Sequence, residues 1–170
     1  MKHPLPARRG ASAILAGAIV VGVLGANALL GLRNSPDPRH AGISIWYHRL
    51  RKPSFTPPDL VFGAVWPILE AGMAIGGYRL LRKPPSRQRN AALGLWLGTN
   101  AMIGGWTEIF FRRHALATST AAAAAMTGAS AAYVATAARV DRPAALAGIP
   151  LTLWLGFATL LADGVRRRNR

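Results

Sequence analysis

Flat aromatic rings and basic side chains are concentrated in one stretch of the chain, residues 46–69. Rings near a water boundary either anchor the end of a membrane helix or line a ligand site. The chemistry available is therefore stacking on a flat, largely apolar ligand, and the rings that offer it here are Trp46, Tyr47, Phe55 and Trp66.

Three prolines, Pro53, Pro57 and Pro58, stiffen the first half of this stretch. Proline fixes its own φ angle and pushes the preceding residue out of the helical region. We therefore expect residues 33–59 to form a rigid, extended, helix-poor loop that covers the ligand site as a lid. So long a connection in a compact bundle is more often functional than idle. The alternative is a solvated segment whose rings only anchor it at the interface.

Catalytic and metal-binding patterns are sparse. The histidines show no metal-ligand spacing. The sequence contains neither a Gly-rich phosphate-binding loop nor a nucleophile motif. The chain has no Cys, which excludes a disulfide, a thiolate metal site and a thiol nucleophile. We expect no catalytic residue, no metal ion and no required cofactor. The histidines are His3, His40, His48 and His114.

Five apolar runs, each of about 20 residues, dominate the rest of the chain. That is the length a helix needs to cross roughly 30 Å of hydrocarbon. Backbone groups in lipid must be satisfied within their own segment, so the runs are helices and not strands. The sequence predicts an all-α membrane protein, a single domain over residues 1–170 built as a bundle of five transmembrane helices. The expected helices are near residues 11–32, 60–81, 91–111, 115–138 and 144–165.

The net charge of +15 would suggest a nucleic-acid partner in a soluble protein. Here the basic residues lie at helix ends and in short connections, where anionic lipid headgroups explain them better. Ten lie on one side of the bundle and eleven on the other, so the positive-inside rule leaves the orientation open. Eighteen Arg against three Lys indicates a GC-rich bacterial source, and hence a bacterial cell membrane.

A cleaved signal peptide is an alternative for the first apolar run. Lys2, Arg8 and Arg9 precede it, and small residues follow near 26–28. The apolar character continues through Leu32, past the would-be cleavage site, which favours a retained first helix.

One acid, Glu70, falls near the middle of the second expected helix. A charged carboxylate at that depth costs about 2.5–3.5 kcal/mol on insertion scales. We therefore expect Glu70 to face a cavity or a partner, or to be protonated. Intramembrane acids also mark proton and ion paths, so a small transporter that uses Glu70 as its proton or ligand site is the alternative function.

The order and spacing of the motif residues resemble the translocator protein and tryptophan-rich sensory protein family (TspO). That family carries W-Y-x-x-L-x-K-P-x-[WF]-x-P-P, followed by V-F-G-x-V-W-x-I-L. Its later motifs are matched in part by Trp106 with Phe110 and Phe111, and by Pro150 with Trp154. The matches to the main motif are Trp46, Tyr47, Leu50, Lys52, Pro53, Pro57, Pro58, Phe62, Gly63, Val65, Trp66 and Leu69.

Several positions depart from the family pattern. Glu70 and Leu151 stand where the family commonly has Tyr, and Ala162 replaces an Asn. Thr99 and Ile103 replace a Gln and an Asn, although Asn100 lies one turn from Ile103 and can present an amide on a similar face. These departures leave the natural ligand open.

The resemblance implies a cavity that binds porphyrins such as protoporphyrin IX or haem, in a sensor, carrier or regulator of porphyrin metabolism. Lys52, with Arg49 and Arg51 nearby, would meet the propionates. Some family members are associated with porphyrin photodegradation, for which Trp66 and Trp154 would be the residues. The expected ligand-binding set is Trp46, Tyr47, Lys52, Pro53, Phe55, Pro57, Pro58, Phe62, Trp66, Glu70, Asn100, Trp106 and Trp154.

Two glycine pairs at four-residue spacing permit close helix packing. Gly72 and Gly76 follow the motif stretch and should be used inside the bundle, whereas the helix with Gly94 and Gly98 can spare an outer face. The resemblance implies a homodimer through this helix. Packing of these glycines within one chain is the alternative.

Overall fold

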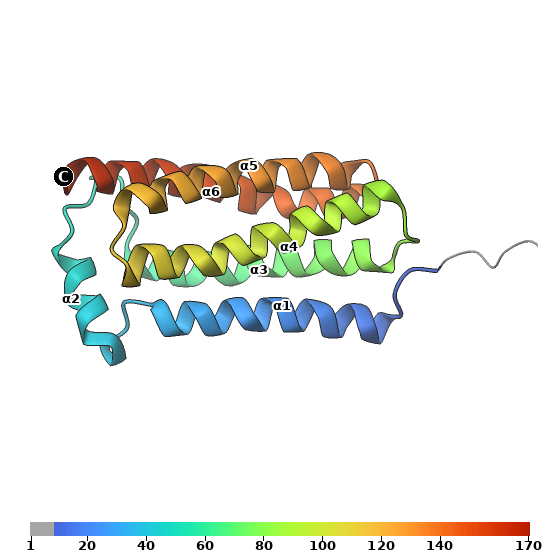
Figure 1. The fold of residues 1–170 in the computed structure, drawn as a ribbon, viewed down its shortest axis with the longest axis horizontal. Coiled ribbons are helices and arrows are strands. Elements are labelled where there is room, and N and C mark those ends of the chain that lie inside the picture. The colour runs from blue at the N-terminus through green and yellow to red at the C-terminus, as the bar shows by residue number, and fades with distance from the viewer. Residues whose placement is uncertain (1–8) are drawn as a thin grey trace, which may run out of the picture.

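The computed structural model describes residues 9–170, and this part of the chain consists of helices and their connections (Figure 1). The expected all-α architecture is confirmed for these residues. Lys2, His3 and Arg8 lie outside the described residues. The helices are α1 (Ala13–Asn34), η1 (Pro38–His40, 3-10), α2 (Ala41–Arg49), α3 (Asp59–Arg82), α4 (Arg87–Thr107), η2 (Glu108–Arg112, π-helical), α5 (Leu116–Ala138) and α6 (Arg142–Arg168).

Five long helices lie side by side, and the short helix α2 lies across the end of the bundle that also holds the C-terminus (Figure 1). Helices α1, α4 and α6 run one way, and α3 and α5 run the other way. Four of the five, α1, α3, α5 and α6, are long and apolar enough to cross a membrane. Helix α4 has 21 residues but is less apolar, because charged and amide side chains interrupt it.

The expected lid loop differs from the prediction, because its first half is helical. Residues 41–49 form α2, which includes Trp46 and Tyr47. No proline lies between Pro38 and Pro53, so nothing prevents a helix there. The helix ends where Leu50 turns to extended backbone, and the residues from 51 to 58 contain no helix. Proline stiffening therefore governs only the second half of the lid.

Local capping places the helix starts where the apolar pattern alone does not. The Ser86 hydroxyl accepts a hydrogen bond from the Arg89 N–H at 3.1 Å, so α4 begins at Arg87, four residues before the expected position. The Asp141 carboxylate accepts from the Ala144 N–H at 2.9 Å and starts α6 at Arg142. Helix α6 then continues to Arg168, beyond its expected end.

Helices α3 and α6 pack with backbone close to backbone. A Cβ atom on Gly72 would come within 2.4 Å of the Ala147 carbonyl oxygen, so no side chain fits at that crossing. One turn later, a Cβ on Gly76 would meet the hydroxyl of Tyr133, which donates to the Ala144 carbonyl at 3.1 Å. This pair of glycines is thus used inside the bundle, as expected.

An ion-pair junction ties α3 to the start of α6 at the end of the bundle away from α2. Arg79 Nε and Lys83 Nζ each lie 2.7 Å from the Asp141 carboxylate, whose side chain is only 2% exposed. Burial alone would raise the pKa of Asp141. Hydrogen bonds from Arg79, Lys83 and the Ala144 N–H outweigh burial and hold that pKa well below its ordinary value.

Asp141→Asn tests this junction, because Asn still caps a helix but carries no charge. We expect the free energy of unfolding in detergent at pH 7 to fall by about 1.5–3 kcal/mol, the range for hydrogen bonds to a charged group. The depressed pKa of Asp141 adds stability above its unfolded value of about 4, and this contribution is lost as pH falls below that. Melting curves from pH 7 to 3 should therefore fall more steeply for the parent than for Asp141→Asn.

Asp37→Asn is the matched control. Asp37 pairs with Arg39 at 2.8 Å on the exposed surface, where hydrogen bonds from Arg39 lower the pKa of Asp37 to about 2. Exposed pairs add little stability, so its melting temperature should stay near that of the parent. If Asp141→Asn and Asp37→Asn lowered the melting temperature equally, a special role for Asp141 would be contradicted.

Candidate ligand-binding site

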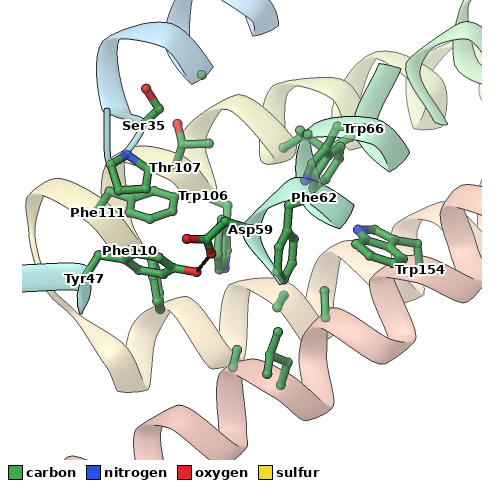
Figure 2. A pocket seen from close by; sticks show the side chains of 18 of the residues that line it. Ser35, Tyr47, Asp59, Phe62, Trp66, Trp106, Thr107, Phe110, Phe111 and Trp154 are labelled. Carbon is green, nitrogen blue, oxygen red and sulfur yellow. Dashed lines mark hydrogen bonds between the residues drawn. The ribbon is translucent and has the colours of Figure 1, made fainter. Parts of the chain in front are cut away.

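A cavity of about 720 Å³ lies at the α2 end of the bundle, lined by α1, α3, α4, η2, α5 and α6 and by the lid (Figure 2). This volume is within the range of ligand pockets, roughly 300–1,000 Å³. The walls are largely apolar and strongly aromatic. The aromatic lining residues are Tyr47, Phe62, Trp66, Trp106, Phe110, Phe111 and Trp154.

Helix α3 supplies one wall through side chains spaced four residues apart. Phe62, Trp66 and Glu70 all line the cavity, because residues at this spacing share one helix face. Across from them, Trp154 of α6 meets the Phe62 ring edge-on, with ring centroids 5.8 Å apart. Figure 2 shows Phe62 and Trp154 near each other at the cavity, with Trp66 farther along α3. A flat ligand in the cavity would meet aromatic surface from both α3 and α6.

The end of α4 and the π-helical turn η2 supply a second group of rings. Trp106 and Phe110 are stacked, with centroids 4.8 Å apart, and Phe111 meets Phe110 edge-on at 4.9 Å. Trp106 Nε1 donates to the Ser119 carbonyl at 2.9 Å, which fixes the indole against α5. The cluster is thus rigidly placed at the lid end of the cavity.

Polar side chains meet where the lid crosses the cavity. The Tyr47 hydroxyl donates to the Asp59 carboxylate at 3.1 Å (Figure 2). His48 Nε2 lies 3.9 Å from the other carboxylate oxygen of Asp59. Lys52 Nζ sits over the Tyr47 ring, 3.5 Å from its centroid. Burial, with the charge and hydrogen bond of Asp59, raises the pKa of Tyr47. Burial lowers the pKa of Lys52, and the Asp59 charge opposes this shift.

The proline-rich half of the lid is fixed to the end of α6. Asn169 bonds to both backbone groups of Arg51, accepting from its N–H at 3.0 Å and donating to its carbonyl at 2.9 Å. Pro53 is buried against Gly164, where an added Cβ would lie 2.6 Å from the proline ring. Phe55 meets Phe157 at 6.3 Å between centroids. Three contacts along α6 therefore hold this half of the lid.

The structure brings seven of the expected site residues together on the cavity wall. They come from α2, the second half of the lid, α3, α4 and α6. The seven are Tyr47, Lys52, Phe62, Trp66, Glu70, Trp106 and Trp154.

Trp46, which we expected in the site, does not line the cavity. Neighbours on a helix point about 100° apart, so α2 turns Trp46 away when Tyr47 faces the cavity. Trp46 instead stacks on the His114 ring, 4.0 Å between centroids, and meets Phe110 edge-on at 5.5 Å. It anchors α2 to the connection between η2 and α5.

Five further expected residues also lie outside the lining. Pro53 packs against Gly164 and not against the cavity. Phe55 is 53% exposed. Pro57 and Pro58 turn the chain into the start of α3. Asn100 is buried on the face of α4 that meets α1, so its amide bonds to a neighbour and not to the cavity.

Sequence reasoning missed several lining residues. Asp59 and Thr56 flank the prolines, and Asn27 comes from α1, from which we expected no site residue. The four-residue spacing from Asp59 through Gly63 to Pro67 would have placed these three on the α3 face next to Phe62 and Trp66. No local signal indicates Asn27, because only helix packing brings it to the cavity.

A family model described as the TspO/MBR family matches residues 16–167. The chain belongs to the TspO/MBR family. It is 33% identical over 126 residues to the translocator protein of Homo sapiens, covering 73% of this chain and 75% of that protein. It is 30% identical over 145 residues to the tryptophan-rich sensory protein of Cereibacter sphaeroides, covering 85% of each chain.

Membership in the TspO/MBR family, together with four helices able to cross a bilayer, makes this an integral membrane protein. The TspO/MBR match runs from the first turns of α1 to the last turn of α6, so it includes every helix that lines the cavity. The cavity is therefore built from family-matched sequence throughout.

Gly164→Ala tests how the lid is held. The added methyl would press into Pro53, so we expect the proline-rich half of the lid to detach while the helices remain folded. Hydrogen exchange at the Arg51 and Thr56 amides, which donate to Asn169 and to the Pro53 carbonyl, should become at least about tenfold faster. Gly156→Ala on the same helix meets open space and is the control. Unchanged exchange in Gly164→Ala would contradict the lid anchor.

Proposed function

We propose that the protein binds a flat, largely apolar tetrapyrrole, such as protoporphyrin IX or haem, in the cavity beneath the lid. It would act as a sensor, carrier or regulator of porphyrin metabolism. The observation that supports this proposal is that Phe62 and Trp66 of α3 and Trp154 of α6 line one cavity of about 720 Å³, where Phe62 and Trp154 meet edge-on at 5.8 Å. Aromatic surface from two helices on one apolar cavity suits a flat aromatic ring.

The mouth of the cavity supports an orientation for such a ligand. Lys52 is the one basic residue among the lining residues that the structure describes, and it lies at the lid. Arg49 and Arg51 are exposed on the same connection. The propionates would meet these cations and water, while the ring would enter between Trp66 and Trp154. Placing the carboxylates at the mouth avoids burying their charge in the apolar interior.

Helix α4 is, in this proposal, a fifth membrane crossing. Its least apolar central residues, Thr99 and Asn100, are 0% and 1% exposed, so the polar groups point into the bundle. The outer face carries Leu97 and small residues that lipid tolerates. A five-helix protein of a bacterial cell membrane follows, with the basic helix ends against anionic headgroups.

The open glycines of α4 support a homodimer. A Cβ atom on Gly94 or Gly98 would meet nothing within 4 Å, in contrast to Gly72 and Gly76 on α3. Two copies could therefore bring these faces together closely, and close packing is what drives helix association in lipid. We propose a symmetric dimer with the same face of α4 on both sides.

Porphyrin binding is tested with three variants, each of which changes one tryptophan. Trp66→Leu and Trp154→Leu should each weaken protoporphyrin IX binding by about 1 kcal/mol, or roughly fivefold in Kd, because stacking surface is lost. Trp46→Phe changes a ring outside the cavity lining but keeps an aromatic stack on His114, so it should leave Kd within about twofold. Titration of the porphyrin Soret band in detergent measures all three without using tryptophan as the reporter. Equal Kd values in all variants and the parent would place the porphyrin elsewhere.

The dimer is tested by Gly98→Leu, which fills the outer face of α4. We expect a folded, porphyrin-binding monomer by light scattering in detergent. Gly128→Leu on α5 also meets open space and should keep the dimer, so it separates a specific interface from a general effect of added bulk. A Gly98→Leu protein with unchanged mass would contradict the interface.

A further inference from the structure

The polar side chains that line the cavity differ in whether the protein already satisfies them. Most donate to a nearby carbonyl or meet one another at the lid, and so have no need of a ligand. The Trp154 indole N–H is buried without a partner, and the Glu70 carboxylate makes no hydrogen bond and no ion pair within residues 9–170. Of these two groups, only Glu70 can carry a charge. The satisfied donors are Ser35 to Leu32 O, Tyr47 to Asp59, Thr56 to Pro53 O, Trp106 to Ser119 O and Thr107 to Gly104 O.

The depth of Glu70 follows from the contact between α3 and α4. Trp96 Nε1 donates to the Met73 carbonyl at 2.8 Å, which sets these antiparallel helices in register. About one turn closer to the lid than this pair, Glu70 lies on α3 and Asn100 lies on α4. Asn100 in turn bonds to Asn27 of α1. Glu70 and Asn27 therefore line the cavity at the same depth, on its inner end.

The orientation of the Asn27 amide is determined by its neighbours. Asn100 Nδ2 donates to the Trp96 carbonyl at 2.8 Å, and a carbonyl can only accept. Asn100 Oδ1 must then accept from Asn27 Nδ2, at 3.2 Å. This leaves Asn27 Oδ1 beside Gly104, which has no side chain to cover it and also lines the cavity. The inner end thus presents two sets of acceptor oxygens.

No cation of the protein neutralises this end. Lys52, the one basic lining residue in the described part of the chain, lies over the Tyr47 ring near Asp59. Asp59 and Glu70 are eleven residues apart on α3, or about 16 Å at 1.5 Å per residue. A half-buried acid in an apolar cavity is usually paired or coordinates something, and a cationic ligand is the partner that this end of the cavity can still accept.

We propose that the inner end of the cavity binds a protonated amine, held by Glu70 and the Asn27 carbonyl oxygen. An ammonium group has three donors and no acceptor, which matches acceptors on two helices. Trp66, one turn before Glu70 on the same face of α3, adds an aromatic surface that attracts a cation. A hydrophobic, aromatic ammonium compound is thus a second class of ligand for this cavity.

Two probes of the same shape test the proposal: 1-pyrenemethylamine, which is cationic at neutral pH, and 1-pyrenemethanol, which is neutral. Energy transfer from tryptophan to pyrene in nonionic detergent gives the affinity of each. The parent should bind the amine at least about tenfold more tightly than the alcohol, since hydrogen bonds to a charged group are the stronger ones. Glu70→Gln should bring this ratio to within about twofold and leave the affinity for the alcohol unchanged.

Glu108→Gln is the matched control, because Glu108 is outside the cavity lining and lies 3.8 Å and 3.9 Å from Arg112 and Arg113. It should keep the ratio of the parent. A parent ratio near one, or a ratio retained in Glu70→Gln, would overturn the proposal. Glu70→Met, of similar length and without a carboxylate, serves as a second variant if Glu70→Gln does not fold.

The same samples separate this inference from porphyrin binding. Porphyrin binding is proposed to depend on stacking at Trp66 and Trp154, and it is read in the Soret band. If the parent shows no preference for the amine but still binds porphyrin, only the ammonium site is overturned. An amine preference with no porphyrin binding contradicts the proposed function and leaves the ammonium site standing.

Discussion

The fit of α3 between α4 and α6 is the constraint on which the rest of the structure depends. A Cβ atom on Gly77 would lie 2.4 Å from the Trp96 ring, and one on Gly72 would lie 2.4 Å from the Ala147 carbonyl oxygen. Glycines therefore occupy the positions of the inner half of α3 that touch its neighbours most closely, Gly72, Gly76 and Gly77. Its lid-side half, by contrast, carries bulky Phe62 and Trp66. The helices that touch at one end are therefore held apart at the other, and the cavity occupies that space.

The lid depends on contacts made by two different helices. Its first half, α2, is anchored through Trp46 to the turn after η2, and its second half is anchored to Gly164 and Asn169 at the end of α6. The Tyr47 and Asp59 side chains, joined at 3.1 Å, meet across the mouth, with His48 and Lys52 beside them.

Much of the fold and part of the site could be predicted from the sequence, because helix periodicity is local. Phe62, Trp66 and Glu70 share a face by spacing alone, and the apolar runs indicate the long helices. The tilt of α2, which removes Trp46 from the site, depends on its stacking with His114, some 70 residues later. The amides Asn27 and Asn100 become a pair only when α1 packs on α4, so their roles could not be assigned from sequence.

The proposed function requires a tetrapyrrole to bind in the cavity under the lid, against the aromatic side chains of α3 and α6. The most direct test is a crystal of the protein grown with haem, with X-ray data collected at the iron absorption edge. We expect one anomalous iron peak per chain inside the cavity, beside the Trp66 and Trp154 rings. An iron peak at the outer face of α4, or on the lid surface near Phe55, would contradict it.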